Sequence, residues 1–423
     1  KSDNASGTEW VKQLEDGMGR NYKTVYPDGA TSTRTYNSLG QLTASIDPDG
    51  VATLYSYTAT GEQNLTGTDL NGDRLINVGG IDRITLNSNN WMSTSPYGNN
   101  MHRSLHWVWS TDNNAASNIV ARTFTKTTGL LSFTTLWHEG TALTISNKTV
   151  YPGSGYVIST NWEPNNHYTV TTNRYGLLRS TTRFNAGGSV ILQTTYGYDA
   201  HNRQNSMTDL FSGTTTCTYN NADQVVSVTT PVPAAGQSAQ TTTRFYDEMG
   251  RNWRTILPDG ASVTNEYHDN GLLKKTYGSR SYPVGYGYDS QGRMRYMTNW
   301  SDFDSSAGAR VTEWQYDSER GFMTNKLYSG EQGPSYTYTP AGRLATRSWA
   351  RLHGGNRITT TYTINAAGDV ASIVYSDGTT GLTNSYDRRG RLSAVLHGDM
   401  LTTRTYSEQN LLLTEKYSGG LLN

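Results

Sequence analysis

A six-residue phrase, Tyr-Asp-x-x-Gly-Arg, recurs along this chain and constrains its fold more than any other feature. Complete copies begin at Tyr246, Tyr288 and Tyr386, and the steps from Tyr246 to Tyr267 and from Tyr267 to Tyr288 are each 21 residues. A period of this length is typical of stacked supersecondary units that bury little surface alone. Degenerate copies that keep the tyrosine and the turn span Tyr36–Leu42, Tyr57–Gln63, Tyr198–Arg203, Tyr219–Val225, Tyr267–Leu273, Tyr316–Met323, Tyr338–Leu344 and Tyr406–Leu411.

The residues around the phrase predict a β-hairpin. In residues 263–278, two segments with alternating side chains flank the turn sequence DNG, which is a hairpin pattern. The glycine of the phrase suits a positive backbone φ, and Asn202 and Asn410, which take its place, are the next best residues for that conformation. A second turn type, with proline or serine before Asp-Gly, occurs at 27–29, 48–50, 258–260 and 376–378.

Two turn types that alternate with strands predict an all-β fold. Stacked hairpins would form one long antiparallel sheet, and the sheet must curl because strands twist. We therefore expect a continuous β-spiral, elongated or hollow, with no single core.

Composition argues against several other classes of protein. The chain has 35 basic and 35 acidic residues, and its arginines are spread along the repeats, so no nucleic-acid partner is expected. An aromatic content of 11% argues against disorder. No apolar run is long enough to span a membrane. The single cysteine, Cys217, lies in a Thr-rich strand pattern and excludes an internal disulfide framework.

These repeats resemble the RHS, or YD-repeat, family. The resemblance is carried by YDEMGR at 246–251, YDSQGR at 288–293, YTPAGR at 338–343 and YDRRGR at 386–391, and it covers most of the chain. Members include bacterial Rhs toxins, shell components of toxin complexes and the teneurins. The resemblance implies a hollow β-spiral shell that encloses a cargo or toxin domain, or a scaffold that presents an interaction surface. It also implies a secreted or bacterial cell-surface location, with the remaining RHS repeats and the C-terminal domain of a parent protein as partners.

The repeated residues have a structural interpretation within such a sheet. The tyrosine ring would cover a cross-strand neighbour, and the aspartate would cap the turn or pair with the arginine. A catalyst is not needed once in every repeat, so we expect no catalytic residues and no enzyme activity. These structural positions are Tyr246, Asp247, Gly250, Arg251, Tyr288, Asp289, Gly292, Arg293, Tyr386, Asp387, Gly390 and Arg391.

One insertion, residues 69–82, resembles the calcium loops of EF-hand and dockerin modules. It departs from that pattern at Arg74, which replaces a glycine, and at Gly80, which replaces an acid. If Ca²⁺ binds, we expect it to stiffen this connection as a structural ion; the alternative is a solvated loop of Asx turns. The predicted ligands are Asp69, Asn71, Asp73, Leu75, Asn77 and Asp82.

Residues 84–166 lose the clear phrase and hold five of the ten tryptophans. Alternation at 107–109 would place Trp107 and Trp109 on one face, where they and Trp137 could stack on sugar rings or pack against neighbouring strands. Four polar residues of the segment could in principle serve a polysaccharide lyase, although their spacing does not require it: His102, Arg103, His106 and His138. Asp302 and Asp304 lie in an expected inter-repeat loop, so a glycosidase pair is not predicted.

The chain thus divides into YD repeats with the insertion at 1–83, divergent Trp-rich repeats at 84–166, and YD repeats at 167–423, all within one continuous unit. The end, Tyr417–Asn423, suggests a strand whose return strand is missing and hence a piece of a longer polypeptide. The leading hypothesis is a structural shell or scaffold segment. The alternatives are a polysaccharide-binding or lyase module that contacts a cell-surface glycan, and an adhesin or filament-forming segment.

Overall fold

The computed structural model describes residues 9–329 and 332–419. It contains 34 β-strands in one sheet, in which each strand pairs antiparallel with the next strand along the chain. Strands β1 (Lys12–Glu15) and β34 (Leu412–Ser418) end the sheet, since β1 pairs with β2 (Asn21–Val25) and β34 with β33 (Met400–Tyr406). The expected all-β fold of antiparallel hairpins is confirmed, and the sheet is not closed. Within the described ranges, no helix has the length and apolar character that a membrane crossing needs.

The strands from β3 to β18 are short at first, lengthen to as many as 13 residues within the Trp-rich segment and then shorten again. They are β3 (Thr31–Tyr36), β4 (Leu42–Ile46), β5 (Ala52–Tyr57), β6 (Gln63–Asp69), β7 (Arg83–Ser95), β8 (Gly98–Val108), β9 (Asn118–Lys126), β10 (Leu131–His138), β11 (Thr141–Gly153), β12 (Tyr156–Trp162), β13 (Tyr168–Arg174), β14 (Leu177–Phe184), β15 (Val190–Tyr198), β16 (Gln204–Asp209), β17 (Gly213–Tyr219) and β18 (Val225–Thr230).

The remaining strands carry the clearest copies of the phrase. They are β19 (Gln240–Tyr246), β20 (Asn252–Ile256), β21 (Ser262–Tyr267), β22 (Leu273–Gly278), β23 (Ser281–Tyr288), β24 (Met294–Asn299), β25 (Arg310–Tyr316), β26 (Met323–Leu327), β27 (Ser335–Tyr338), β28 (Leu344–His353), β29 (Asn356–Ile364), β30 (Val370–Tyr375), β31 (Leu382–Tyr386) and β32 (Leu392–His397).

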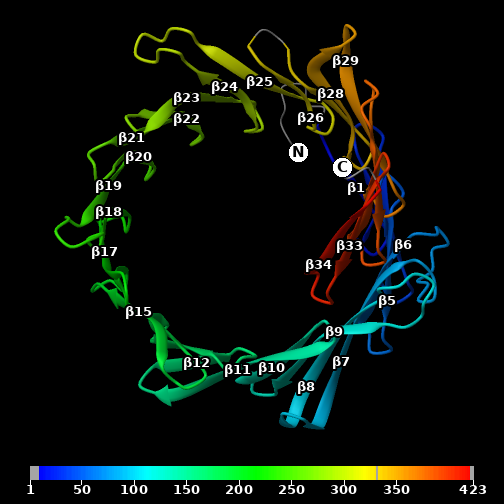
Figure 1. The fold of residues 1–423 in the computed structure, drawn as a ribbon, viewed down its shortest axis with the longest axis horizontal. Helices are drawn as coiled ribbons and strands as arrows, with labels where there is room; N and C mark the ends of the chain where they lie inside the picture. Colours follow the sequence, from blue (N-terminus) through cyan, green and yellow to red (C-terminus); the bar gives the residue numbers. More distant parts are fainter. Residues whose placement is uncertain (1–8, 330–331, 420–423) are drawn as a thin grey trace.

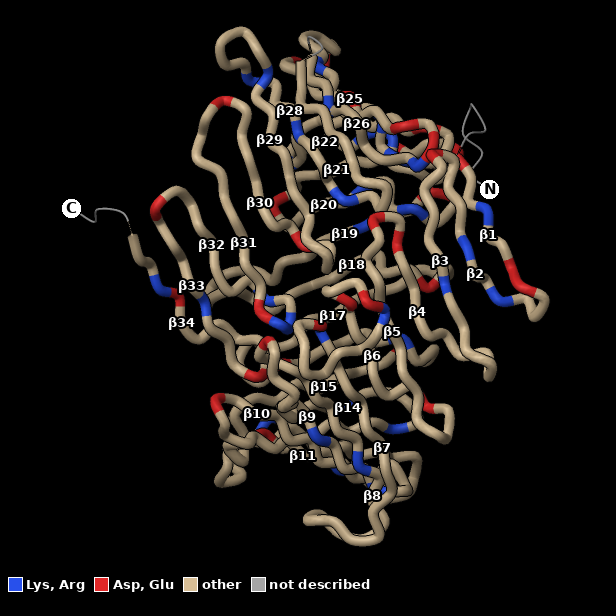
Figure 2. Tube along the Cα trace, turned by 90° about the vertical axis from the view of Figure 1, so that its right-hand side faces the viewer, with Lys and Arg blue, Asp and Glu red and all other residues tan. Residues whose placement is uncertain are grey.

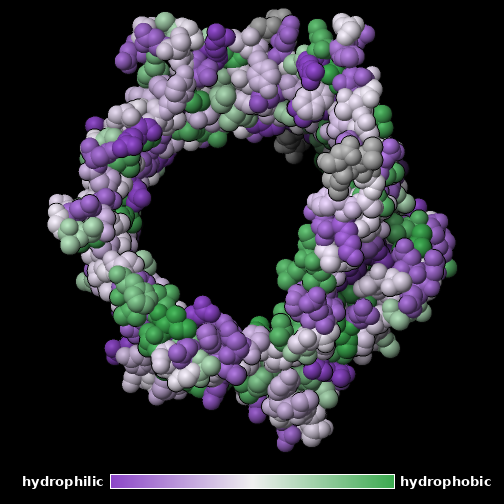
Figure 3. Space-filling model, viewed as in Figure 1, coloured by the Kyte–Doolittle hydropathy of each residue, from purple (hydrophilic) through white to green (hydrophobic). Residues whose placement is uncertain are grey.

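The sheet curls into a spiral of more than one circuit around an open centre (Figure 1). The space-filling view shows that side chains do not fill this opening (Figure 3). After one circuit the chain returns to its start, and β25–β34 lie beside β2–β11 (Figure 2). We call β1–β23 the first circuit and β24–β34 the second circuit. The curl follows from the twist that neighbouring strands share.

Consecutive antiparallel pairing sorts the turns onto two edges of the ribbon. The copies of the Tyr-Asp phrase all lie in turns that follow odd-numbered strands, so we call this edge the YD edge. Turns that follow even-numbered strands include Pro-Asp-Gly at 27–29, 48–50 and 258–260, so we call theirs the PDG edge. The insertion at 69–82 joins β6 to β7 and therefore lies on the PDG edge.

Apolar burial is thin, as expected for a spiral without a single core. Most of the buried apolar side chains of the described residues lie between Ala52 and Phe124, in β5–β9 and the loops that join them. Elsewhere most side chains are half-buried. The wall therefore depends on strand pairing and on the polar networks of its turns.

Several local expectations are confirmed. The hairpin expected at 263–278 is β21 and β22, and Asn202 and Asn410 have φ values of 63° and 64°. Asp302 and Asp304 lie in the connection between β24 and β25. The expected end of the chain falls partly on residues 420–423, which lie outside the described residues, as do residues 1–8 of the first segment.

Candidate functional site: the seam between two circuits

Each Tyr-Asp turn is organised by its aspartate. The carboxylate of Asp247 accepts hydrogen bonds from the backbone N–H groups of Met249 and Arg251, at 3.0 and 2.8 Å, and from Nε of Arg251 at 2.7 Å. Gly250, with a φ of 77°, closes the turn. These bonds together hold the pKa of Asp247 below its usual value. Asp289 and Asp387 repeat the same geometry, so turn capping and pairing with arginine occur together.

The tyrosine and arginine connect one repeat to the next. The hydroxyl of Tyr267 donates to the carbonyl of Asn252 at 2.7 Å, and the guanidinium of Arg251 lies 4.8 Å from the centre of the Tyr267 ring. Tyr246 reaches Val225 in the same way, at 2.8 Å, and Tyr386 reaches Val370 at 2.9 Å. The repeated residues thus stabilise the interfaces between hairpins.

The turns also join the two circuits. Hydrogen bonds and ion pairs connect residues 268 to 311 positions apart in the chain. In each of them the PDG edge of the first circuit meets the YD edge of the second circuit. We call this line of contact the seam. Its polar pairs include Glu9–Arg293, Asp28–Arg320, Asp47–Arg343, Asp49–Arg343, Arg83–Asp369, Val120–Gln409 and Gly140–Glu408.

Asp49 completes a turn of the second circuit that lacks its own aspartate. In YTPAGR, Thr339 stands where other copies have aspartate. The Asp49 carboxylate accepts hydrogen bonds from the hydroxyl of Thr339 at 2.7 Å, the N–H of Ala341 at 2.9 Å and Nη1 of Arg343 at 2.6 Å. Burial opposes ionisation, but these bonds and the charge of Arg343 outweigh it and lower the pKa of Asp49. A side chain from one circuit therefore caps a turn in the other circuit.

Arg388 inserts into the loops of the first circuit. Its side chain is buried, with 2% of the residue exposed, and all five of its N–H groups donate to backbone carbonyls. Nε reaches the carbonyl of Asp82 at 2.8 Å, and the two Nη atoms reach four further carbonyls at 2.8–3.0 Å, those of Asn77, Val78, Thr111 and Asn114. Burial lowers the pKa of Arg388, yet arginine stays charged at any ordinary pH. One guanidinium therefore ties together the insertion at 69–82 and the loop between β8 and β9.

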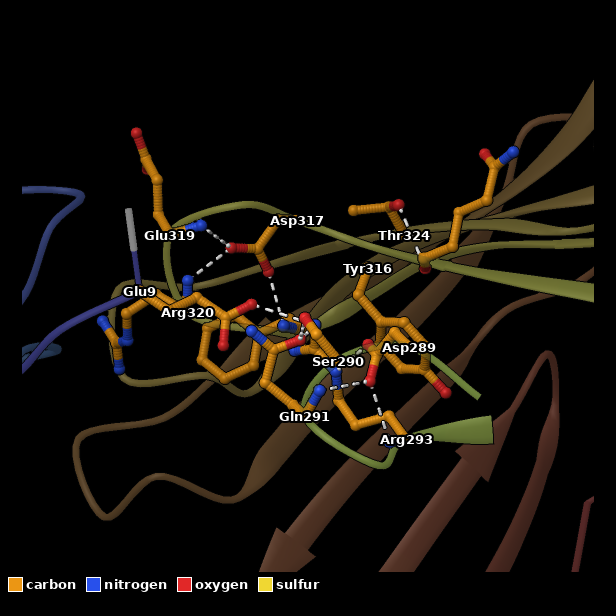
Figure 4. Close-up of polar contacts among 12 residues, drawn as sticks. Glu9, Asp289, Ser290, Gln291, Arg293, Tyr316, Asp317, Glu319, Arg320 and Thr324 are labelled. Carbon is orange, nitrogen blue, oxygen red and sulfur yellow. Dashed lines mark hydrogen bonds and ion pairs between the residues drawn. The ribbon is translucent and has the colours of Figure 1, made fainter. Parts of the chain in front are cut away.

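The start of the described chain lies at one end of the seam (Figure 4). Glu9 forms an ion pair with Arg293 at 3.0 Å, and Asp317 accepts hydrogen bonds from the N–H groups of Glu319 and Arg320 in the adjacent turn. Next to them is an open recess of about 790 Å³, lined by aromatic and charged side chains that include Trp314. The recess is part of the seam, since Glu9 from the first circuit contributes to its wall.

The other end of the seam is held by Glu408 and Gln409. The carboxylate of Glu408 accepts hydrogen bonds from the N–H groups of Glu139 and Gly140 at 2.8 and 3.2 Å. Its own N–H and then these two groups lower the pKa of Glu408. Nε2 of Gln409 donates to the carbonyl of Val120 at 2.7 Å. Backbone groups of the first circuit are thus satisfied by side chains of the second circuit.

The predicted calcium ligands lie in one loop, but their oxygens are occupied by the loop itself. Asp69 accepts N–H groups of Gly72 and Arg74, and Asp82 accepts those of Leu70 and Asn77. The remaining ligand positions are on the outside: Asp73 accepts from Asn71, Leu75 and Asn77. Across residues 9–329 and 332–419, no three acidic, histidine or cysteine side chains form a group that could hold a metal. In this arrangement the residues do not fit Ca²⁺, and its binding stays a prediction that requires the loop to rearrange.

The predicted tryptophan platform is not formed as the alternation suggested. Strand β8 ends at Val108, after a register shift between His106 and Trp107. Trp109 is only 5% exposed, and its indole N–H donates to the carbonyl of Ala115 at 3.0 Å, so it packs beneath the loop. The guanidinium carbon of Arg122 lies over the ring of Trp137, 5.4 Å from the ring centre. Trp109 is therefore not available to a sugar, and glycan binding stays a prediction.

The four residues considered for a lyase have separate partners. Nδ1 of His106 lies 2.8 Å from the side-chain oxygen of Asn87, and burial followed by the charge of Arg389 lowers the pKa of His106. His102 contacts the ring of Trp91, and Nε of Arg103 donates to Asn90. His138 lies 3.9 Å from Glu139. Nothing in this geometry brings the four to a common point.

The seam residues were not predicted from the sequence. Departures from the phrase could have indicated them, because Thr339 replaces an aspartate and Arg388 is one of two additional arginines in YDRRGR. Which distant segment each departure faces depends on the circumference of the spiral. That length follows from the curl of the sheet and cannot be read from a local pattern.

Residues 36–73, which run from the last residue of β3 through β4–β6 into the insertion, match the family model described as RHS Repeat. Residues 36–73 thus carry an RHS repeat. The turn geometry described above recurs well outside the matched residues, at Asp247, Asp289 and Asp387. No curated protein is detectably similar in sequence to this chain.

A solved structure shares the fold of this chain. The crystal structure of TcdB2-TccC3-Cdc42 is similar with a TM-score of 0.57 and 12% identity, over 94% of this chain and 24% of that chain. The crystal structure of TcdB2-TccC3 gives 0.45 and 12%, over 97% and 27%, and a Photorhabdus luminescens Tc holotoxin pore gives 0.44 and 11%, over 97% and 29%. This chain therefore spans about a quarter of the length of these proteins. The β-spiral expected from the repeats is that of an RHS shell.

Proposed function

We propose that this chain is a wall segment of a larger hollow RHS shell that encloses a cargo domain. The observation that carries the proposal is the seam, because it joins successive circuits of a ribbon into a continuous wall around an open centre (Figure 1). The chemistry of the repeats agrees with a structural role. Their tyrosine, aspartate and arginine side chains bind one another and the backbone.

The proposed partners are further RHS repeats and a C-terminal domain of the same parent protein, which the wall would shield from solvent. TcdB2-TccC3 is crystallised with Cdc42 in one similar structure, which supports a wall of this fold that works within a larger assembly. We propose a secreted or cell-surface location for the parent protein. A wall joined by many weak, dispersed contacts suits this role because its stability adds up over neighbouring units.

The test is protection of the interior in the complete polypeptide that contains this chain. We expect cryo-electron microscopy to show density inside a continuous wall, and limited proteolysis to spare the enclosed domain. The matched variant Asp49→Ala with Arg388→Ala opens the seam and should expose the same domain to protease. An empty wall, or a domain cleaved equally in both proteins, contradicts enclosure and leaves a scaffold with an external binding surface.

A further inference from the structure

One side of β7 has no partner strand over most of its length. The strand runs from Arg83 to Ser95, but its pairing with β6 ends at Leu86, whereas on its other side it pairs with β8 as far as Ser95. Residues 87–95 therefore leave one row of backbone N–H and C=O groups without a strand beside it. At about 3.4 Å per residue, this row is about 30 Å long. We call residues 87–95 the free edge of β7.

The free edge lacks the devices that usually protect an exposed strand. Such edges are normally blocked by charged residues, by proline or by a β-bulge. Residues 87–95, NSNNWMSTS, contain no charged residue and no proline, and no register shift interrupts their pairing with β8. By contrast, β34 at the end of the sheet carries Glu415 and Lys416, and the part of β28 that extends beyond β27 carries Arg351. The free edge of β7 is thus open to pairing with a further strand.

The hairpin of β7 and β8 stands apart from the seam. Where the seam crosses these strands, it contacts Arg83 at the start of β7 and Val120 near the start of β9. Both contacts lie at the end of the hairpin opposite to its tip. The tip itself projects outward from the wall, at the bottom of Figure 1. A further circuit stacked along the wall would therefore leave the tip and the free edge exposed.

The free edge is complementary to a second copy of itself. Two identical strands can pair antiparallel about a two-fold axis, and Trp91 is the middle residue of 87–95. An axis at Trp91 brings the two indoles together, and each asparagine on the same face then lies opposite a serine. These cross-strand pairs are Trp91 with Trp91, Asn89 with Ser93 and Asn87 with Ser95. Aromatic pairs and hydrogen-bonding pairs across strands stabilise a sheet, and the absence of charge means that two such edges do not repel each other.

The indole of Trp91 is held in place and is accessible. Trp91 is 68% exposed, and its ring meets the ring of His102, directly opposite on β8, with the ring centres 4.9 Å apart. The other face of the hairpin is packed, since Met101 and Leu105 of β8 are buried. Side chains alternate between the faces of a strand, so this packing anchors the hairpin and leaves the Trp91 face free for a partner.

We propose that two copies of this chain associate through the free edges of β7, which pair antiparallel about a two-fold axis at Trp91. The contact joins the two projecting hairpins into one continuous sheet between the outer surfaces of two walls. Such an isologous contact uses the same surface on both copies and closes at a dimer. The association goes beyond the enclosing role and needs no cargo.

The proposal is tested by placing a charge at residue 91 and measuring association by sedimentation velocity. We expect the unaltered chain to shift from monomer to dimer as its concentration rises. Trp91→Lys and Trp91→Glu should each remain monomeric, because the two-fold axis places like charges opposite each other. An equimolar mixture of the two variants should form a one-to-one complex, because lysine then faces glutamate. Trp253→Lys, on β20, which is paired on both sides, is the control and should dimerise like the unaltered chain.

Three outcomes overturn the proposal. The first is an unaltered chain that stays monomeric at high concentration or grows beyond a dimer, and the second is association that persists in either charged variant alone. The third is a mixture of the two variants that remains monomeric although each variant keeps the strand content of the unaltered chain by circular dichroism. None of these results depends on whether the wall encloses a cargo, so they leave the enclosing role untouched.

Discussion

Aspartate and arginine serve two purposes in this chain, and the purpose depends on where each side chain finds its partner. Within a turn, Asp247 binds Arg251 and two backbone N–H groups of its own phrase. In the seam, Asp49 gives an equivalent set of bonds to a turn almost 300 residues away. The bond types are alike, so a single substitution decides whether a turn is satisfied locally or from another circuit.

Arg388→Lys tests the guanidinium that ties two loops. Lysine has at most three donors, so at least two of the five carbonyls lose their partner, and each unpaired buried acceptor costs about 1–3 kcal/mol. We expect faster amide hydrogen exchange in residues 77–82 and 111–114. Arg183→Lys, at an exposed pair with Glu163, is the control and should leave exchange unchanged. Equal protection in Arg388→Lys would mean that the guanidinium does not hold these loops.

Thr339→Asp tests the turn at 339–343, which is capped by the carboxylate of Asp49. The substitution restores the usual phrase but places a second carboxylate beside Asp49, and like charges at this distance repel. We expect the seam to weaken in the single variant and to recover when Asp49→Asn is added, with a coupling of about 1–3 kcal/mol between the two sites. Hydrogen exchange of the amides around Ala341 measures the stability of the seam in each variant. Thr337→Asp, at an exposed neighbouring position, is the control. Additive effects of the two substitutions would contradict a shared carboxylate site.

Among the elements, hairpins follow from local sequence and the seam does not. Alternating side chains and the Asp-Asn-Gly turn predicted β21 and β22 because turn type and side-chain period are set by neighbouring residues. The alternation expected at 107–109 does not extend to Trp109, because β8 ends at Val108. The insertion at 69–82 was recognised, but its contact with Arg388 was not, since no local rule specifies a partner 306 residues away.

Gly17 and Gly19 lie in the turn between β1 and β2, and alanine substitutions there test whether a positive φ by itself makes a side chain destabilising. Gly19 has a φ of 76° and Gly17 does not have a positive φ, while a Cβ would meet nothing within 4 Å at either position. Gly19→Ala should destabilise the β1–β2 hairpin by about 1–2 kcal/mol. Gly17→Ala should be neutral or stabilising by up to about 1 kcal/mol. Hydrogen exchange of β2 measures both, and an equal effect of the two substitutions would count against the strained turn.

Calcium binding to the insertion is testable apart from the seam. From its sequence, we expect Ca²⁺ to raise the melting temperature by several degrees relative to chelator, as for any ligand that binds the folded state alone. The shift should disappear in Asp69→Ala with Asp73→Ala and persist in Asp259→Ala, which alters a different PDG turn. Identical melting with Ca²⁺ and with chelator would leave hydrogen bonds and Arg388 as the organisers of the loop.

At the scale of the whole molecule, the sequence predicted a spiral but not its circumference. Repeats and strand twist are sufficient for a curled sheet, whereas the circumference depends on small angles that add up over more than twenty strands. That circumference decides which PDG turn meets which YD turn. The seam is therefore a property of the complete ribbon, and its residues could be identified only once the two circuits were seen together.

The seam should open in acid. The pKa values of Asp49 and Glu408 are lowered in the folded protein, so their stabilising effect is present above the unfolded values, about 3.9 and 4.3. It is lost as the pH falls through the lower folded values. We expect the radius of gyration from X-ray scattering to stay constant between neutral pH and about 5 and to rise in stronger acid.

Carboxylates outside the seam also titrate, so a matched variant is needed. In Asp49→Asn with Glu408→Gln, the seam no longer depends on these two charges, and the expansion should depend less steeply on pH. A variant that expands over the same pH range as the unaltered chain would attribute the change to the turns within each circuit.

The five carbonyls that accept hydrogen bonds from Arg388 also determine when the seam can form during synthesis. The carbonyls of Asn77, Val78 and Asp82 are made long before their donor, which follows Asp82 by 306 residues. A ribosome that adds about 5–20 residues per second needs roughly 15–60 seconds to cover that interval. Until then these carbonyls can bind only water, and the early hairpins must persist as an open ribbon. The wall can thus be completed only near the end of translation of this stretch, when Arg388 can donate its hydrogen bonds to these carbonyls.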